Sequence, residues 1–225
     1  MSSCSSYYSA DMNREEKLPR LYAIIDAGRF AVGKNALRQT MDFAQQLLEG
    51  GATLIQYRNK KSGGMELLSH LRELRRVVGA HATLIMNDRA DLCLSSGCDG
   101  VHLGQEDLSV EGARSIVGNS AIVGISTHNL QQISGADQTS ADYIAVGPIF
   151  ATSTKINPEP VVGLELIRAA REATRKPIVA IGGITCANCR SVIEAGADSV
   201  AVISELQTLP RKSVEQFLRE LSASG

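Results

Sequence analysis

Four short polar clusters contain the side chains of this sequence whose types and spacing suit chemistry. They are Gln56-Tyr57-Arg58-Asn59-Lys60, Asn87-Asp88, Gly104-Gln105-Glu106-Asp107 and Thr152-Ser153-Thr154-Lys155. Two carboxylates with several cations, amides and hydroxyls are the groups that a hard cation and a bound diphosphate require. The clusters therefore predict a site for Mg²⁺ and a diphosphate, if the fold brings them together.

The first cluster has its polar side chains in alternate positions. Gln56, Arg58 and Lys60 are each two residues apart, at the end of a β-rich run. Because side chains alternate across a strand, all three point to the same side. This spacing favours a shared role in binding an anion, and the alternative is a solvated loop after a strand.

Two aspartates are the candidate ligands of a metal ion. Asp88 and Asp107 each follow a predicted strand, and Mg²⁺ usually takes one or two protein carboxylates plus phosphate and water oxygens. The alternative is that each aspartate caps the helix that follows it, which for Asp107 begins near Ser109. His102, just before the second aspartate, is interpreted as a hydrogen-bonded interior histidine.

Three further strand ends suggest a second anion site. The loop after the sixth predicted strand is rich in hydroxyls and ends in Lys155, and the alternative is an ordinary surface turn. Gly182-Gly183 and Ile203-Ser204 end the seventh and eighth strands, where barrels often bind phosphate through backbone N–H groups and a helix N-terminus. The mouth thus has room for two phosphorylated substrates, which suggests a joining reaction.

The elements that must position these clusters alternate between strand and helix. We predict eight strands, at residues 21–26, 53–57, 83–87, 100–103, 122–126, 143–147, 178–181 and 199–203. Amphipathic stretches such as Leu37 to Leu48 and Met65 to Val78 separate them. Eight such units, without a dinucleotide-type glycine fingerprint after the first strand, favour a closed (β/α)8 TIM barrel over an open sheet. We expect one barrel domain over residues 19–225, after a disordered tail over residues 1–18.

Composition limits the partners. The 225 residues include 23 basic and 24 acidic side chains, a net charge of -1 that gives no long-range attraction for nucleic acid or an anionic membrane. No apolar run approaches the ~20 residues that span a bilayer, and the N-terminus lacks the apolar core of a signal peptide. We expect a cytoplasmic protein with small-molecule substrates. The sequence is compatible with either a homo-oligomer or a monomer.

The five cysteines predict reduced thiols rather than a disulfide framework, because their number is odd and small. Cys186 and Cys189 form a Cys-x-x-Cys, but no second ligand pair with zinc-finger spacing follows. We therefore expect no metal or redox role for this pair.

Seven motifs resemble those of the thiamine-phosphate synthase family, in order and at plausible spacing from Leu21 to Leu206. They are Gln-x-Arg-x-Lys, Asn-Asp-Arg, Val-His-Leu-Gly-Gln-x-Asp, Gly-x-Ser-x-His, Gly-Pro-x-Phe-x-Thr-x-Thr-Lys, Gly-Gly-Ile and Gly-Ala-Asp-x-Val. The chain departs from the family's usual pattern at Ile25 and Ala151. Neither departure removes a charged site residue. The resemblance implies a (β/α)8 barrel that joins a hydroxymethylpyrimidine diphosphate to a thiazole phosphate and releases pyrophosphate, with Mg²⁺ as cofactor.

The same resemblance assigns expected roles by residue. It implies that Asp88 and Asp107 hold Mg²⁺ and that Arg58, Lys60 and Lys155 act on the departing pyrophosphate. The expected pyrimidine-diphosphate set is Gln56, Arg58, Lys60, Asn87, Ser126 and Lys155. The expected set for the second phosphate is Thr152, Thr154, Gly183, Ile203 and Ser204. Tyr57, Asn59 and Ser153, which stand within the same clusters, are also expected to bind substrate.

The mechanism expected from these roles needs no protein nucleophile. Electrostatic stabilisation of the leaving group and orientation of two substrates would supply the rate. Two rivals are a thiazole-phosphate tautomerase and a non-catalytic sensor of thiamine intermediates. The retained diphosphate residues argue against the first. A turnover assay distinguishes the second, since a sensor is stabilised by ligand without forming product.

Overall fold

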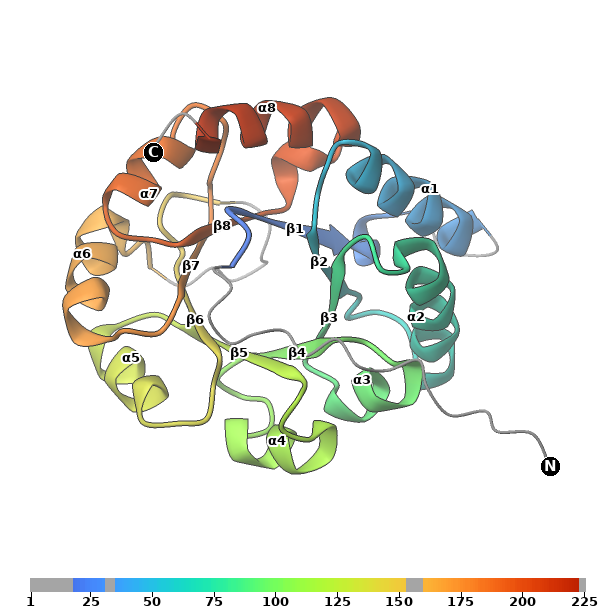
Figure 1. Cartoon of the computed structure of the whole chain (residues 1–225), viewed down its shortest axis with the longest axis horizontal. Coiled ribbons are helices and arrows are strands. Elements are labelled where there is room, and N and C mark those ends of the chain that lie inside the picture. The colour runs from blue at the N-terminus through green and yellow to red at the C-terminus, as the bar shows by residue number, and fades with distance from the viewer. Residues whose placement is uncertain (1–17, 31–34, 153–159, 223–225) are drawn as a thin grey trace.

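Eight parallel strands close into a barrel in sequence order (Figure 1). The computed structural model describes residues 18–30, 35–152 and 160–222. The strands are β1 (Leu21–Asp26), β2 (Leu54–Arg58), β3 (Thr83–Asn87), β4 (Gly100–Leu103), β5 (Ile122–Thr127), β6 (Tyr143–Val146), β7 (Ile178–Ile181) and β8 (Ser199–Val202). The predicted (β/α)8 fold is confirmed. Of the predicted tail, only Leu18 lies within the described residues.

Helices follow the strands and form the outer ring of Figure 1. They are α1 (Asn35–Glu49), α2 (Gly64–Val78), α3 (Ala90–Ser96), α4 (Val110–Val117), α5 (Leu130–Asp137), α6 (Gly163–Ala173), α7 (Cys189–Glu194) and α8 (Pro210–Ser222), with short 3-10 turns η1 (Ala27–Arg29) and η2 (Ser204–Leu206). None of the helices within the described ranges is both long and apolar enough to cross a membrane.

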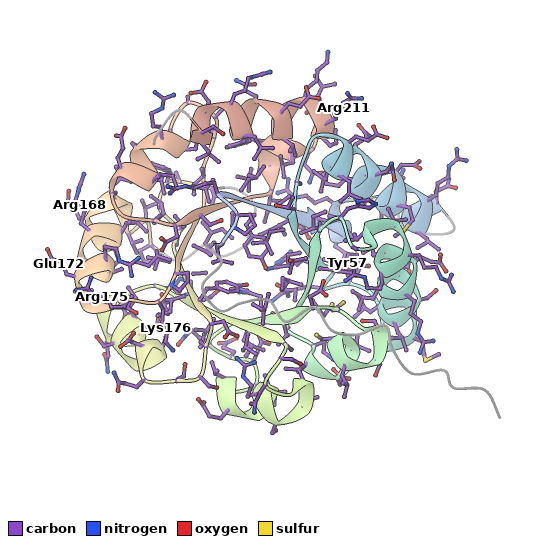
Figure 2. The ribbon with its side chains drawn as sticks, viewed as in Figure 1. Tyr57, Arg168, Glu172, Arg175, Lys176 and Arg211 are labelled. Atoms are coloured by element: carbon purple, nitrogen blue, oxygen red, sulfur yellow. The ribbon has the colours of Figure 1, made fainter. Side chains whose placement is uncertain are left out.

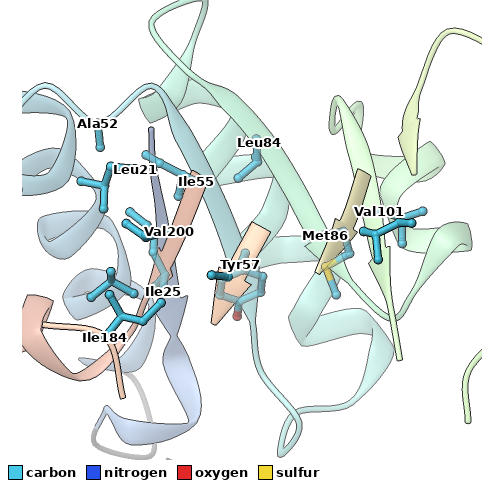
Figure 3. Close-up of a cluster of buried hydrophobic side chains, with 14 of the residues drawn as sticks. Leu21, Ile25, Ala52, Ile55, Tyr57, Leu84, Met86, Val101, Ile184 and Val200 are labelled. Atoms are coloured by element: carbon cyan, nitrogen blue, oxygen red, sulfur yellow. The ribbon is translucent and has the colours of Figure 1, made fainter. Parts of the chain in front are cut away.

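The main core lies between the strands and the surrounding helices. Alternate strand residues, among them Ile25, Ile55, Tyr57 and Val101, point outward into this layer and are fully buried (Figure 3). Because both faces of a barrel sheet are covered, the strands are almost continuously apolar, which is why their positions could be predicted from sequence.

The barrel interior is filled by a smaller set of side chains. Tyr22 and Tyr143 are the bulkiest of this set, and their rings meet edge to face with centroids 6.0 Å apart. Gly124 on β5 faces Tyr143 so closely that any side chain at Gly124 would overlap the tyrosine ring. The interior below the mouth is therefore a packed core, with polar groups from two tyrosines inside it.

Aspartates before β4, β6 and β8 tie the strands together at the end of the barrel where they begin. Each carboxylate accepts a backbone N–H from the preceding strand, at 2.7–2.8 Å, and also pairs with an arginine of an earlier helix. The pairs are Asp99 with Arg75, Asp142 with Arg114 and Asp198 with Arg171. Charge-assisted bonds of this kind stabilise the end opposite the mouth.

Candidate active site

A cavity of about 360 Å³ opens at the carboxyl ends of the strands. It brings together residues from all eight strands, which are far apart in sequence. The predicted site residues that line it are Gln56, Arg58, Lys60, Asn87, Asp88, Ser126, Thr152, Gly183, Ile203 and Ser204. Asp107 contacts Asp88 beside the cavity.

Two residues of the expected substrate-binding set point away from the cavity. The Tyr57 side chain is fully buried between β2 and α2 (Figure 2), where its hydroxyl lies 2.8 Å from Nδ1 of His70. Asn59 builds the loop after β2, since its amide accepts from the backbone N–H groups of Lys61 and Ser62. Both therefore support the loop that carries Arg58 and Lys60. Ser153, Thr154 and Lys155 lie outside the described residues.

Arg58 is fixed in place by a partner on the neighbouring strand. Its Nη1 donates to Oδ1 of Asp26 at 2.8 Å, and the register pairs these two residues at the ends of β1 and β2. The Asp26 side chain is 6% exposed and that of Arg58 19%, so the pair is held in a partly dry environment. Arg29 on η1 approaches the other oxygen of Asp26 at 3.5 Å. The guanidinium is thus positioned before any ligand arrives.

Lys60 is held more loosely. Its Nζ lies 3.2 Å from Oδ2 of Asp88, but 57% of the lysine side chain is exposed. Exposed ion pairs contribute at most ~1 kcal/mol, so Lys60 can exchange this partner for a phosphate oxygen at little cost. Arg58 and Lys60 therefore offer one fixed and one adjustable cation on the same side of the cavity.

Asp88 has a strained backbone that turns it into the mouth. Its φ is 64°, a conformation that non-glycine residues rarely adopt, and its N–H donates to the carbonyl of His102 at 2.7 Å. The side chain does not cap a helix: the residue at the start of α3 is Arg89, without a side-chain cap. Asp107 does not cap either, because Ser109 caps α4 by accepting from the N–H of Gly112.

The two aspartates form a compact anionic pair. Burial, and then the neighbouring Asp107 carboxyl, raise the pKa of Asp88 above its usual range. Asp107 is oriented by the Gly104 N–H, which donates to its Oδ2 at 2.7 Å. A carboxyl whose ionisation is disfavoured by burial and by a neighbouring carboxyl is relieved when a cation binds beside it. Across the described ranges, no group of three or more His, Cys, Asp or Glu forms a metal site.

The floor of the cavity comes mainly from interior-facing residues, with polar side chains on one part of it and apolar ones such as Ile24, Ala145 and Val179 on the rest. Tyr22, Gln56, His102 and Ser126 line it, and His102 is 9% exposed with both ring nitrogens hydrogen-bonded. The interpretation of His102 as an interior histidine is confirmed, although its ring also reaches the floor. Sequence reasoning missed Tyr22, Tyr143 and Asp26, and the alternation of Tyr22 with the outward residues of β1 was the available signal.

The loop after β6 is attached to the end of β7. The N–H groups of Ile149 and Phe150 donate to the carbonyls of Ile181 and Gly182 at 2.9 and 3.0 Å. A Cβ atom at Gly182 or Gly183 would lie 2.5 Å from Pro148 or Ala151 respectively, so glycine is needed for this close approach. The attachment delivers Thr152 to the mouth beside Gly183.

The ends of β7 and β8 form one side of the mouth. Asp88 lies on the opposite side, because it follows β3, which is four strands away from β7 in the closed ring. Asn188 braces this side, since its Nδ2 donates to the Gly183 carbonyl at 3.1 Å. The regular helix α7 begins only at Cys189, so loop backbone faces the cavity after β7, whereas after β8 the short helix η2 begins at Ser204, which lines the cavity. Ile203 and Ser204 complete this side, and Glu205 also lines the cavity.

His128 lines the cavity, and its side chain hydrogen-bonds to the backbone of the neighbouring loop. Its Nδ1 hydrogen-bonds to the carbonyl of Gly147, at the start of the loop after β6. Gln132 accepts the backbone N–H of His128. This histidine therefore holds the β5 and β6 ends together, and its hydrogen-bond partners in the described part of the chain include no carboxylate that would orient it as a base.

Comparison with known proteins gives the family. A family model described as thiamine monophosphate synthase matches residues 21–206. The chain is 57% identical over 205 residues to a thiamine-phosphate synthase of Koribacter versatilis, covering 91% of this chain and 97% of that protein. It is 44% identical over 186 residues to that of Chloroflexus aurantiacus, covering 82% and 83%. A solved thiamine phosphate pyrophosphorylase from Pyrococcus furiosus is 33% identical with a TM-score of 0.79, covering 91% of this chain and 96% of that chain. The chain therefore belongs to the thiamine monophosphate synthase family.

Proposed function

We propose that the chain is a thiamine-phosphate synthase that joins 4-amino-2-methyl-5-(diphosphooxymethyl)pyrimidine to a thiazole phosphate and releases pyrophosphate. The observation that carries the proposal is one cavity with two unlike sides. Cations and paired aspartates lie at β2, β3 and β4, whereas glycine and hydroxyl groups lie at β7 and β8. These sides face each other across the ring, so two phosphorylated substrates fit with their reacting ends between them.

The residues at the first side fit a bound Mg²⁺. Asp88 and Asp107 would hold it, because two close carboxylates leave most of an octahedral shell for phosphate and water oxygens. When bound, the ion neutralises charge on the diphosphate oxygens. Its positive charge also favours the ionised form of Asp88, which reverses the unfavourable effect of burial on that carboxyl.

Arg58 and Lys60 bind the diphosphate. Arg58 meets it with a guanidinium already oriented by Asp26, so little entropy is lost on binding. Lys60 leaves Asp88 for a phosphate oxygen as the ligand and its cation arrive. Both positive charges then face the oxygen that becomes more negative as the C–O bond breaks.

The second substrate binds at the other side. Gly183, Ile203 and Ser204 offer loop backbone and a hydroxyl to its phosphate, with Thr152 beside them. Glycine at position 183 removes the side chain that would otherwise block the approach of the anion. Thr154 belongs to the same expected set by sequence.

The reaction follows from this arrangement. The C–O bond between the pyrimidine methylene and the diphosphate breaks, and both electrons leave with pyrophosphate. The electron-rich aminopyrimidine ring stabilises the methylene cation, and the thiazole nitrogen supplies the electron pair of the new C–N bond. The protein holds both reactants in line and stabilises the leaving group, so the enzyme is a transferase without a covalent intermediate. Lys155 is predicted from sequence to add a third cation.

Turnover with defined substrates tests this proposal. We expect thiamine phosphate, identified by mass, only when the pyrimidine diphosphate, the thiazole phosphate and Mg²⁺ are all present. Conversion of a thiazole phosphate isomer without the pyrimidine would indicate a tautomerase instead. Ligand-induced stabilisation without product would indicate a sensor. We place the enzyme in the cytoplasm, where reduced thiols are maintained.

A further inference from the structure

A continuous line of hydrogen bonds crosses the floor of the cavity. Nε2 of Gln56 lies 2.8 Å from the Tyr22 hydroxyl, which lies 3.0 Å from the Tyr143 hydroxyl. The Tyr143 hydroxyl is 2.8 Å from Nδ1 of His102, and Nε2 of His102 is 2.8 Å from Oγ of Ser126. Five strands contribute one residue each, and the two ends of the line, Gln56 and Ser126, both face the cavity.

The donor and the acceptor of each hydrogen bond in this line can be assigned by following the protons from Gln56. The Gln56 amide donates to the Tyr22 oxygen, so Tyr22 places its own proton on the Tyr143 oxygen. Tyr143 then donates to Nδ1 of His102. A neutral imidazole that accepts at Nδ1 carries its proton on Nε2 and donates to Ser126. The Ser126 oxygen thus accepts the hydrogen bond from His102, which leaves the hydroxyl proton of Ser126 to donate to a ligand in the cavity.

We propose that Tyr22, Tyr143 and His102 are positioning residues that fix Ser126 as a hydrogen-bond donor and the carbonyl oxygen of Gln56 as an acceptor. A 4-aminopyrimidine presents the complementary pair along one edge, a ring nitrogen that accepts beside an amino group that donates. The line therefore selects the aminopyrimidine and holds its ring in one orientation. This inference rests on the proposed function, because it concerns the same substrate.

The surroundings keep the line from reorganising. Tyr22 and Tyr143 are each 1% exposed, and burial raises the pKa of both phenols, so both remain protonated donors. The His102 ring stacks on Tyr143 at 15° between planes, and Gly124 leaves the space that Tyr143 fills. A buried hydroxyl without a partner is costly, so each member depends on its neighbours.

The opposite direction makes a different and measurable prediction. If Ser126 donated to Nε2, the His102 proton would sit on Nδ1 and Ser126 would present an acceptor to the cavity. Nitrogen-15 NMR of the ligand-free protein distinguishes the two tautomers, with His102 assigned by its absence from a His102→Asn variant. We expect the proton on Nε2. A proton on Nδ1, or a doubly protonated ring at neutral pH, would overturn the proposal whether or not the enzyme turns over.

Selectivity between two pyrimidines tests the consequence. The 4-amino pyrimidine diphosphate and its 4-oxo analogue differ in the direction of hydrogen bonding along this edge. With Mg²⁺ present, wild type should bind the amino compound about 100-fold more tightly than the oxo compound. Tyr143→Phe should lower that ratio about tenfold or more, because the ring stays while the hydroxyl that accepts from Tyr22 and donates to His102 is lost. Inorganic pyrophosphate with Mg²⁺ should bind equally to both proteins.

Thr127→Val is the matched control. Thr127 is fully buried on β5 next to Ser126, donates to the Ala145 carbonyl at 2.9 Å, and points away from the cavity. It should lose stability but keep the amino-to-oxo ratio. An unchanged ratio in Tyr143→Phe, with turnover of the wild type intact, would refute the positioning role while leaving the proposed function standing. Absence of wild-type turnover would refute the proposed function instead.

Discussion

At the residue scale, Asp88 combines three unfavourable properties at one position. Its backbone is in the left-handed region, its carboxyl is desolvated, and a second carboxyl faces it. Each property costs stability in the free protein, and each is relieved or used when a cation binds between Asp88 and Asp107. Strain of this kind is typical of functional sites.

Replacing either aspartate tests the metal assignment. Asp88→Asn and Asp107→Asn should each lower kcat/KM by about 100-fold or more and raise the Mg²⁺ concentration needed for half-maximal rate, because an amide is a weaker ligand than a carboxylate. Asp91→Asn is the control, since Asp91 is an exposed neighbour on α3 that pairs with Arg89. Steady-state kinetics over a Mg²⁺ series measures both effects. An unchanged metal requirement in the two variants would show that the ion binds elsewhere.

The raised pKa of Asp88 has a second consequence, for stability. A carboxyl whose pKa is higher in the folded state than in the unfolded state favours folding when protonated, so ionised Asp88 destabilises the metal-free protein at neutral pH. Asp88→Asn should therefore melt higher than wild type at pH 7 without Mg²⁺, by about 2–4 °C per kcal/mol relieved. The advantage should shrink as the pH falls through the raised pKa and vanish below about 3.9. An equal or lower melting temperature at pH 7 would contradict the assigned desolvation.

At the element scale, the contact between the β6 and β7 loops decides where the second anion binds. Ile149 and Phe150 extend the pairing beyond β7, and the glycines at 182 and 183 let the two segments touch. The segment after β7 thus fixes the position of the loop after β6, and both form this side of the mouth.

Two glycines with nearly the same φ make it possible to distinguish the effect of this loop contact on substrate binding from the effect of backbone strain on stability. Gly183 has φ 64° and Gly163 has φ 67°, but a Cβ at Gly183 would press on Ala151 whereas at Gly163 it would meet open space. Both alanine variants should lose about 1 kcal/mol from the unfavourable φ. Gly183→Ala should in addition raise the KM for the thiazole phosphate about tenfold or more, as the loop moves. Equal KM values in the two variants would remove this loop contact from the account.

The strands were predictable because barrel strands are buried on both faces and therefore apolar, and the alternation of Gln56, Arg58 and Lys60 correctly placed all three in the cavity. The same alternation places Tyr57 on the other face, so the expectation that Tyr57 binds substrate, which rested on its place within the polar cluster, is not supported by its burial. The hydrogen bonds that Asp26 makes with Arg58 and Tyr22 with Tyr143 could not be predicted, because the partners lie 32 and 121 residues apart and only the closed ring brings them together.

At the scale of the whole molecule, stability and chemistry occupy opposite ends of the barrel. The Asp–Arg clamps of Asp99, Asp142 and Asp198 lie where strands begin, whereas the cavity lies where they end. This separation lets one end carry strain and desolvated charge while the other holds the ring closed.

Asp142→Ala should therefore affect stability alone. It removes the acceptor of the Val123 N–H and the partner of Arg114, and charge-assisted bonds of this kind contribute about 1.5–3 kcal/mol. We expect melting to fall by about 2–4 °C per kcal/mol with kcat/KM unchanged below the transition. Asp42→Ala is the control, because its pair with Arg38 is 65% and 83% exposed and should contribute little. A large loss of activity in folded Asp142→Ala would contradict the separation of the two ends.

The central claim is that one cavity joins two phosphorylated substrates with loss of pyrophosphate, and the stoichiometry of a single turnover tests it most directly. Enzyme in excess over the pyrimidine diphosphate is mixed with saturating thiazole phosphate and Mg²⁺, and both products are quantified after quenching. The account predicts pyrophosphate and thiamine phosphate in equal amounts, appearing at the same rate. Pyrophosphate released without an equal amount of thiamine phosphate, or no release at all from active folded protein, would contradict it.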